Sequence, residues 1–128
     1  MSTRCNIIIR KENNPDNPIY VYHHCDGYPE GVGSELKDII SNHYTEAFIN
    51  PSSIEQLLYK YDSQYEETDN IHGDIEYLYI LTVMDDGRVK YQCIDVPLME
   101  DYIYETLKNC ELIEECFLIP DDLGEDEN

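Results

Sequence analysis

The sequence is poor in basic residues: 8 Lys and Arg stand against 28 Asp and Glu, which gives a formal net charge of −20 at pH 7. Binding to DNA or RNA through phosphate neutralisation needs a basic surface, and adhesion to anionic membranes needs clustered Lys and Arg. The composition therefore excludes direct nucleic-acid binding and electrostatic attachment to a membrane.

Long hydrophobic runs and paired cysteine motifs are also missing. No apolar stretch approaches the length of a membrane span, and the first residues do not form the apolar core of a signal peptide. The 5 cysteines are an odd number and include no Cys-x-x-Cys pair. This is typical of free thiols in a reducing compartment rather than of a zinc ribbon or a disulfide scaffold. We therefore expect a cytoplasmic protein that needs no cofactor.

The 128 residues contain alternating strand and helix patterns. Runs rich in strand formers predict strands at 5–10, 19–24, 75–83, 88–93 and 115–119, with 75–83 in the centre of a sheet because it is apolar on both faces. Apolar residues at helical spacing predict three helices. The first covers 34–48, the second is a short helix that begins at a capping box of Ser52 and Glu55, and the third covers 97–110. The order ββ-α-α-ββ-α-β predicts an α+β fold with a mainly antiparallel sheet and helices packed on one face.

Turn formers and polar residues separate these elements. The cluster at 13–18 predicts a hairpin turn, and the polar, acidic stretch at 62–74 predicts a mobile loop. We expect residues 1–120 to form a single domain and residues 121–128 to form an acidic, disordered tail.

The acidic residues are concentrated in the second half of the chain. Residues 65–128 carry 19 of the 28 acids and 3 of the 8 bases. Such a field raises encounter rates with basic partners, although acidity can also serve solubility alone. The tyrosines beside the acidic stretch (Tyr59, Tyr61 and Tyr65) are candidates for an interface. We predict an acidic interaction face made by Glu66, Glu67, Asp69, Asp101, Glu105, Glu111, Glu114 and Glu115.

A second candidate site is the segment from His23 to Gly33. A strand would place His23 and Cys25 on one face and His24 and Asp26 on the other. His24 and Asp26 are therefore weak metal-ligand candidates that need partners such as His43, His72 or Asp74. The alternative is one buried, hydrogen-bonded histidine and one in solvent. The glycines that follow precede a helix, where backbone amides bind anions, but they also suit a tight turn. The alternative ligand site comprises His23, His24, Asp26, Gly27, Tyr28, Gly31 and Gly33.

The N-terminal third carries a motif that resembles a known family. Thr3 and Arg4 are followed by His-x-Asp-Gly-Tyr-Pro-x-x-x-Gly at 24–33, and Gly-Asp-Ile-Glu-Tyr-Leu-Tyr stands at 73–79. Over 2–36 and 73–80 the chain resembles a family of small uncharacterised proteins of bacteriophages and bacterial mobile elements. It departs from that family at His24 and Cys25, where many relatives carry an aromatic residue next to the aspartate. The resemblance implies a phage or mobile-element product that acts in the bacterial cytoplasm.

Together these patterns lead to two hypotheses of different classes. The first is a non-enzymatic acidic module that binds a basic surface on a host protein and inhibits a nucleic-acid-binding defence enzyme by charge mimicry. The alternative is a domain centred on the His-His-Cys-Asp-Gly-Tyr-Pro segment that binds a small ligand or a metal and has catalytic potential. The patterns specify neither the partner's identity nor the oligomeric state.

Overall fold

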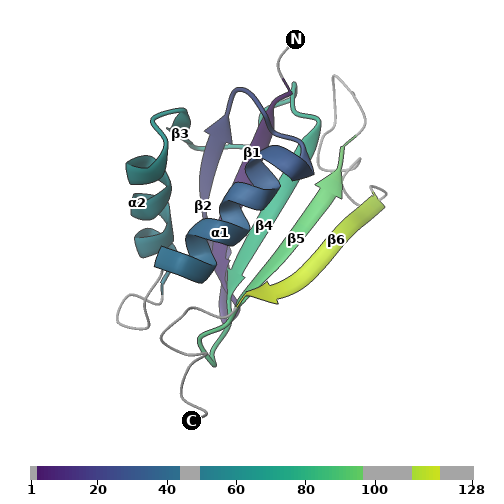
Figure 1. The fold of residues 1–128 in the computed structure, drawn as a ribbon. Coiled ribbons are helices and arrows are strands. Elements are labelled where there is room, and N and C mark those ends of the chain that lie inside the picture. The colour runs from purple at the N-terminus through teal and green to yellow at the C-terminus, as the bar shows by residue number, and fades with distance from the viewer. Residues whose placement is uncertain (1–2, 44–49, 97–110, 119–128) are drawn as a thin grey trace.

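A computed structural model describes residues 3–43, 50–96 and 111–118. In these residues six strands form one sheet in the order β3-β2-β1-β4-β5-β6 (Figure 1). The strands are β1 (Cys5–Lys11), β2 (Asn14–His23), β3 (Tyr65–Thr68), β4 (Tyr77–Val83), β5 (Val89–Asp95) and β6 (Glu111–Leu118). The helices are a π-helical turn η1 (Pro29–Gly33), α1 (Ser34–His43) and α2 (Pro51–Tyr61). The α+β class is confirmed.

The sheet is mixed rather than uniformly antiparallel. Four pairings are antiparallel, but β1 and β4 run parallel from Cys5 beside Tyr77 to Lys11 beside Val83. The long connection between these two strands contains α1 and α2, and such a crossover allows the chain to return in the same direction. The predicted central position of the strand at 75–83 is confirmed, since β4 lies between β1 and β5.

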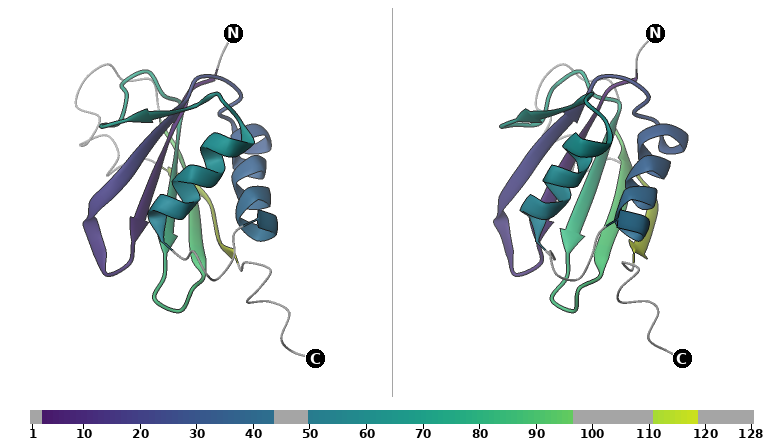
Figure 2. Two further views of the ribbon diagram at one scale, coloured as in Figure 1. Left: turned by 90° about the vertical axis from the view of Figure 1, so that its left-hand side faces the viewer. Right: turned by 60° about the vertical axis from the view of Figure 1, so that its left-hand side comes forward.

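Both α-helices pack on the same face of the sheet (Figure 2). Leu36, Ile39 and Ile40 of α1 and Ile54 and Leu58 of α2 are almost completely buried. They pack against the alternate strand residues that point to this face, which include Ile7, Ile9, Val21, Tyr79, Leu81, Val89, Tyr91 and Cys93. The prediction of helices on one face is thus confirmed for these two helices.

The predicted element order is wrong at one strand. The stretch 62–74, expected to be a mobile loop, contains β3, which pairs with β2 from Tyr65 opposite His23 to Thr68 opposite Tyr20. The physical reason is Tyr65, whose ring is 3% exposed and belongs to the core under the helices. One buried aromatic residue anchors an otherwise acidic strand, and the expectation that Tyr65 lies at an interface is wrong.

The hairpin turn is also shorter than predicted. The turn is at residues 12–13, and residues 14–18 belong to β2. Proline cannot donate to a strand ladder and is tolerated at sheet edges. Pro15 and Pro18 fit because β3 pairs with β2 only from Tyr20 onward, so that this part of β2 has no neighbour on its outer side among the described residues.

The start of α2 differs from the predicted capping box. The N-cap is Asn50, whose side-chain oxygen accepts from the Ser53 N–H at 2.9 Å, and Pro51 occupies the first turn. Asn is as good an N-cap as Ser, and Pro suits the first helical position, so this pair prevails over Ser52 and Glu55. Glu55 instead accepts a hydrogen bond from the Tyr59 hydroxyl at 2.8 Å.

Some predictions fall outside the described residues. These are the end of the helix at 34–48, the helix at 97–110 and the tail at 121–128. The described cysteines, Cys5, Cys25, Cys93 and Cys116, are free thiols, as expected. Among the described residues, no helix combines the length and the apolar character needed to cross a bilayer.

Candidate functional site

The described acidic candidates lie on opposite edges of the sheet. Glu66 and Glu67 belong to β3 and Asp69 follows it, whereas Glu111, Glu114 and Glu115 belong to β6. We call the first three the β3-edge acids and the last three the β6-edge acids. Asp101 and Glu105 lie outside the described residues. Among the described residues the predicted single acidic face is therefore two separate surfaces.

Two of the β6-edge acids are engaged by neighbouring side chains. Glu114 pairs with Lys37 of α1 at 2.5 Å and accepts from the Tyr91 hydroxyl at 3.3 Å. Glu115 pairs with Lys90 of β5 at 3.2 Å and accepts from Gln92 at 3.0 Å. Their charges are thus partly compensated within the protein.

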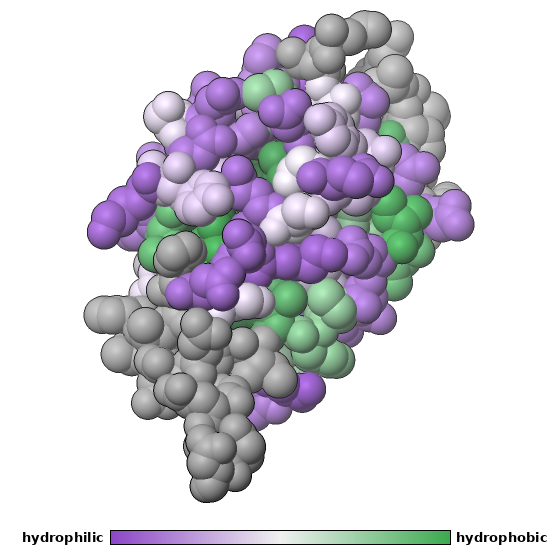
Figure 3. Space-filling view, viewed as in Figure 1, coloured by the Kyte–Doolittle hydropathy of each residue, from purple (hydrophilic) through white to green (hydrophobic). Residues whose placement is uncertain are grey.

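The β3-edge acids are exposed, and within the described part of the chain no ion pair involves them. Glu67 and Asp69 line an open hollow of about 370 Å³, to which α2 contributes Glu55. Burial, a hydrogen bond to Glu55 and the charges of Glu55 and Glu67 raise the pKa of the nearby Tyr59 hydroxyl. Hydrophilic side chains also cover most of the described surface on the helix side (Figure 3).

The glycine segment forms a closed turn. The N–H of Gly27 donates to the Thr3 carbonyl, that of Gly31 to Tyr28, and that of Val32 to Asp26. A Cβ at Gly31 would lie 2.3 Å from the Asp26 carbonyl oxygen, and one at Gly33 would lie 2.7 Å from the Tyr91 hydroxyl. Because these amides already have partners and the glycines allow close packing, the segment matches the tight-turn interpretation better than an anion site.

His23 and His24 have different environments. β2 ends at His23, which is 2% exposed, whereas His24 and Asp26 lie beyond the strand and are exposed. Strand alternation therefore does not apply to His24 and Asp26. Asp26 adopts a φ of 56°, which turns the chain toward η1, and the exposed Tyr28 hydroxyl lies 3.4 Å from its carboxylate.

The partners expected for a metal site also lie elsewhere. His72 stacks on Tyr22 with the ring centroids 4.1 Å apart, and Asp74 pairs with Arg4 at 3.3 Å. The His43 side chain is outside the described part of the structure. None of these described contacts joins His24 to Asp26, so the structure does not assemble the predicted pair into a ligand set.

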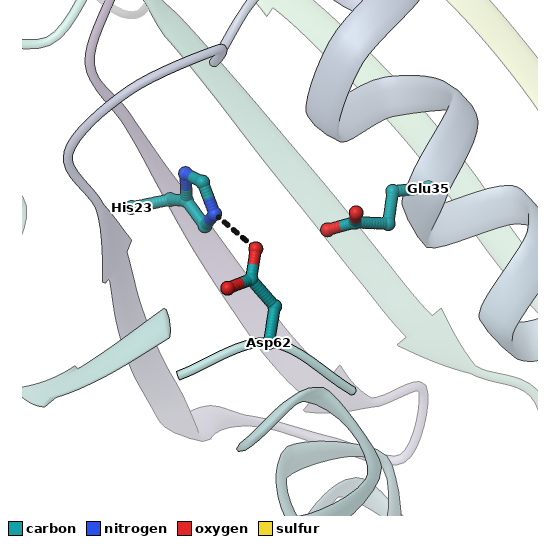
Figure 4. Close-up of side chains that lie close together, drawn as sticks. All are labelled: His23, Glu35 and Asp62. Atoms are coloured by element: carbon teal, nitrogen blue, oxygen red, sulfur yellow. Dashed lines mark hydrogen bonds and ion pairs between the residues drawn. The ribbon is translucent and has the colours of Figure 1, made fainter. Parts of the chain in front are cut away.

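His23 instead faces two carboxylates that the sequence patterns did not single out. Its Nε2 lies 3.1 Å from Oδ2 of Asp62, and Glu35 completes a group whose ligand atoms all lie within 4.8 Å of one another (Figure 4). Asp62 follows the last turn of α2, and Glu35 lies in the first turn of α1. We call these three residues the His23 cluster.

Neighbouring groups hold each member of the His23 cluster in place. The His23 Nδ1 lies 2.5 Å from the Cys25 carbonyl oxygen, and the Tyr65 hydroxyl donates to Glu35 at 2.6 Å. Burial raises the pKa of Asp62, but hydrogen bonds from the Gln64 N–H and from His23 outweigh it, so that the pKa is lowered overall. Asp62 is therefore held as a carboxylate.

Cys25 lies beside this cluster but is not an activated nucleophile. Burial and the nearby carboxylates of Asp26, Asp62 and Glu35 raise the pKa of its thiol, and the thiol donates to Gln64 at 2.6 Å. The reactive form of cysteine is the thiolate, which needs a lowered pKa. His23 contacts the Cys25 carbonyl rather than its sulfur. A Cys-His nucleophilic pair is thus absent from this part of the described structure.

No protein-family model, no curated protein and no solved structure matches this chain. The resemblance to phage and mobile-element proteins therefore stays a prediction.

Proposed function

We propose that the protein is an acidic interaction module that binds a basic surface of another protein through its β3-edge acids. The observation that carries this proposal is the contrast between the two acidic edges. Glu66, Glu67 and Asp69 are exposed and form no ion pair among the described residues, whereas Glu114 and Glu115 are paired with lysines. Unpaired carboxylates are the ones available to a partner.

The net charge should increase the rate of association with a basic partner more than it strengthens the final complex. A potential of one sign over the surface accelerates the encounter with an oppositely charged protein, and this acceleration falls with ionic strength. At 0.15 M salt the Debye length is about 8 Å, so that charges spread over a whole molecule act mainly at close approach. Binding should therefore weaken steeply as salt is added.

The finer proposal is inhibition of a host enzyme. Carboxylates on the β3 edge would occupy a basic groove that normally holds nucleic acid, as phosphates do, and so block the true ligand. The resemblance to phage and mobile-element proteins supports a host defence enzyme as the target class. The bacterial cytoplasm is the compartment in which that encounter would occur.

A pull-down tests this proposal. The tagged full chain is incubated with nuclease-treated bacterial lysate, washed at low and then high salt, and compared with the E66K/E67K variant. We expect a basic nucleic-acid enzyme that binds the wild type, is released by salt and is lost in the variant. The E114K/E115K variant is the matched control for an equal change in net charge. Equal retention by E66K/E67K and the wild type would contradict the proposal.

The alternative of a small-ligand site in the glycine turn has less support, because the amides of that turn are engaged by backbone carbonyls. The alternative hypothesis named a small ligand or a metal, and only metal binding is supported by an arrangement of side chains. That arrangement is the His23 cluster rather than His24 and Asp26.

A further inference from the structure

The proton positions on His23 are the starting point. A carbonyl oxygen can only accept a hydrogen bond, so the Nδ1 that contacts the Cys25 carbonyl carries a proton. In a neutral imidazole the other nitrogen, Nε2, then has a bare lone pair. That lone pair points at the Asp62 carboxylate 3.1 Å away. Two acceptors cannot face each other at this distance without a positive charge between them, which is either a second proton on His23, as an imidazolium that donates to Asp62, or a bound metal ion.

The surroundings indicate a cation with more than one positive charge. The His23 side chain is 3% exposed, and both Asp62 and Glu35 approach it from the helical side of the sheet. Figure 4 shows their carboxylates directed toward the imidazole from two different segments. One extra proton on His23 would leave one of the two carboxylates uncompensated, whereas a divalent ion would neutralise both.

We propose that His23 Nε2, Asp62 and Glu35 bind a divalent first-row transition metal of the zinc class. This proposal is independent of the acidic-edge function. Zinc lies about 2.0–2.2 Å from nitrogen and oxygen ligands, which places tetrahedral ligand atoms about 3.4 Å apart. The Nε2 to Oδ2 distance of 3.1 Å is already close to this value. The ligand atom of Glu35 lies within 4.8 Å of the other two, so this half-buried side chain has to approach the ion as it binds.

The supporting contacts are those of a metal site. Metal-binding histidines usually donate their other N–H to a carbonyl or carboxylate, and metal-binding carboxylates are themselves hydrogen-bonded. Here His23 donates to the Cys25 carbonyl, Asp62 accepts from the Gln64 N–H at 3.0 Å, and Glu35 accepts from the Tyr65 hydroxyl. Each of the three ligands therefore has one orienting partner.

The ligand types select among metals. Calcium and magnesium prefer sites made only of oxygen ligands, while an imidazole favours zinc and its neighbours. The Asp62 side chain is 26% exposed, so that the ion can enter from solvent and water can take a remaining coordination position.

The test is a zinc titration of the EDTA-stripped full chain in 0.3 M NaCl with excess Mg²⁺, which occupies the exposed acids. Calorimetry and the ¹⁵N resonances of the histidine rings are the measurements. We expect one equivalent of zinc to bind and to shift the Nε2 resonance of His23 but not the ring resonances of His24. D62N and E35Q should each weaken binding by more than about tenfold, since even the loss of a supporting group has effects of that size.

Matched controls separate this site from general acidity. E66Q and D69N remove carboxylates of the same kind from the β3 edge and should leave zinc binding unchanged. Both D62N and E35Q are isosteric, and their fold is checked by the dispersion of the same spectra. The proposal is overturned if no one-equivalent site exists, if D62N and E35Q bind zinc like the wild type, or if His23 is doubly protonated and insensitive to zinc.

Discussion

The two edges of the sheet carry similar numbers of acidic residues but differ in how available their charges are. On the β6 edge, lysines from α1 and β5 hold Glu114 and Glu115. On the β3 edge, no ion pair among the described residues involves Glu66, Glu67 or Asp69. The comparison teaches that net charge, which the sequence provides directly, differs from the charge that a partner can reach.

The edges also differ in how they are attached. β3 has 4 residues, and its single buried side chain is Tyr65. β6 has 8 residues, pairs with β5 along its whole length, and presents exposed apolar side chains at Leu112, Ile113 and Phe117. The position of the β3-edge acids on the sheet therefore depends on one buried side chain, that of Tyr65.

The largest effect is expected from removing that anchor. Tyr65→Ala should lower the free energy of unfolding by about 3–5 kcal/mol, the usual cost of deleting a buried aromatic ring, and should detach β3 from β2. Chemical denaturation measures the stability, and amide exchange at residues 65–68 measures the attachment. Tyr28→Ala, at a ring that is 39% exposed, is the control. A loss below about 1 kcal/mol, typical of surface changes and small defects, would show that Tyr65 does not anchor β3.

The next effect concerns association with a basic partner identified by pull-down. E66K/E67K should slow association by about tenfold at low salt, because electrostatic steering acts mainly on that rate. E114K/E115K should have a smaller effect, since its carboxylates are already paired. Stopped-flow or surface plasmon resonance at several salt concentrations gives both rates. Equal slowing by both variants would mean that only net charge matters and that the two edges are equivalent.

A smaller effect is expected at the start of α2, the helix that contributes Glu55 to the hollow on the β3 edge. Asn50→Ala removes the acceptor of the Ser53 N–H and should lower the free energy of unfolding by about 1 kcal/mol. Ser52→Ala, at the residue that the sequence pattern favoured as cap, should cost less. Thermal unfolding of both variants decides between the two caps, and a larger loss for Ser52→Ala would favour the original capping box.

The smallest effect is expected from a substitution that makes the β6 edge more like the β3 edge, because it leaves one β6-edge acid without its lysine partner. Lys37→Met removes the ammonium that pairs with Glu114 and lies 5.2 Å from the centre of the Tyr91 ring, and it keeps an unbranched side chain at this position. Because both partners are about one-third exposed, the loss of stability should be only about 0.2–1 kcal/mol. Binding of the basic partner should be unchanged or slightly faster. Slower binding would place the contact surface on α1 instead of the β3 edge.

The sequence predicted those strands whose own residues show a clear pattern of strand-forming residues. The strands predicted near 5–10, 75–83 and 88–93 are confirmed. β3 was missed because one tyrosine among acids gives no periodic pattern. The parallel pairing of β1 with β4 was missed because nothing local specifies it.

The His23 cluster could be predicted only in part. His23 itself was singled out, but Asp62 lies 39 positions away in the sequence, and Glu35 belongs to a helix whose pattern describes only its apolar side. Their meeting depends on how α1 and α2 pack across the sheet. The only sequence signal is that Asp62 ends a helix and Glu35 begins one, and helix ends are places where side chains converge.

The central position of β1 has a consequence for synthesis of the protein. Cys5 pairs in parallel with Tyr77, so β1 leaves the ribosome before this neighbour, which is made 72 positions later. At about 5–20 residues per second, this delay is roughly 4–14 s. During that time one side of the apolar run of Ile7, Ile8 and Ile9 has no native strand beside it, and such an edge can pair with other chains. The nascent chain is therefore open to such pairing until β4, which begins at Tyr77, has been made.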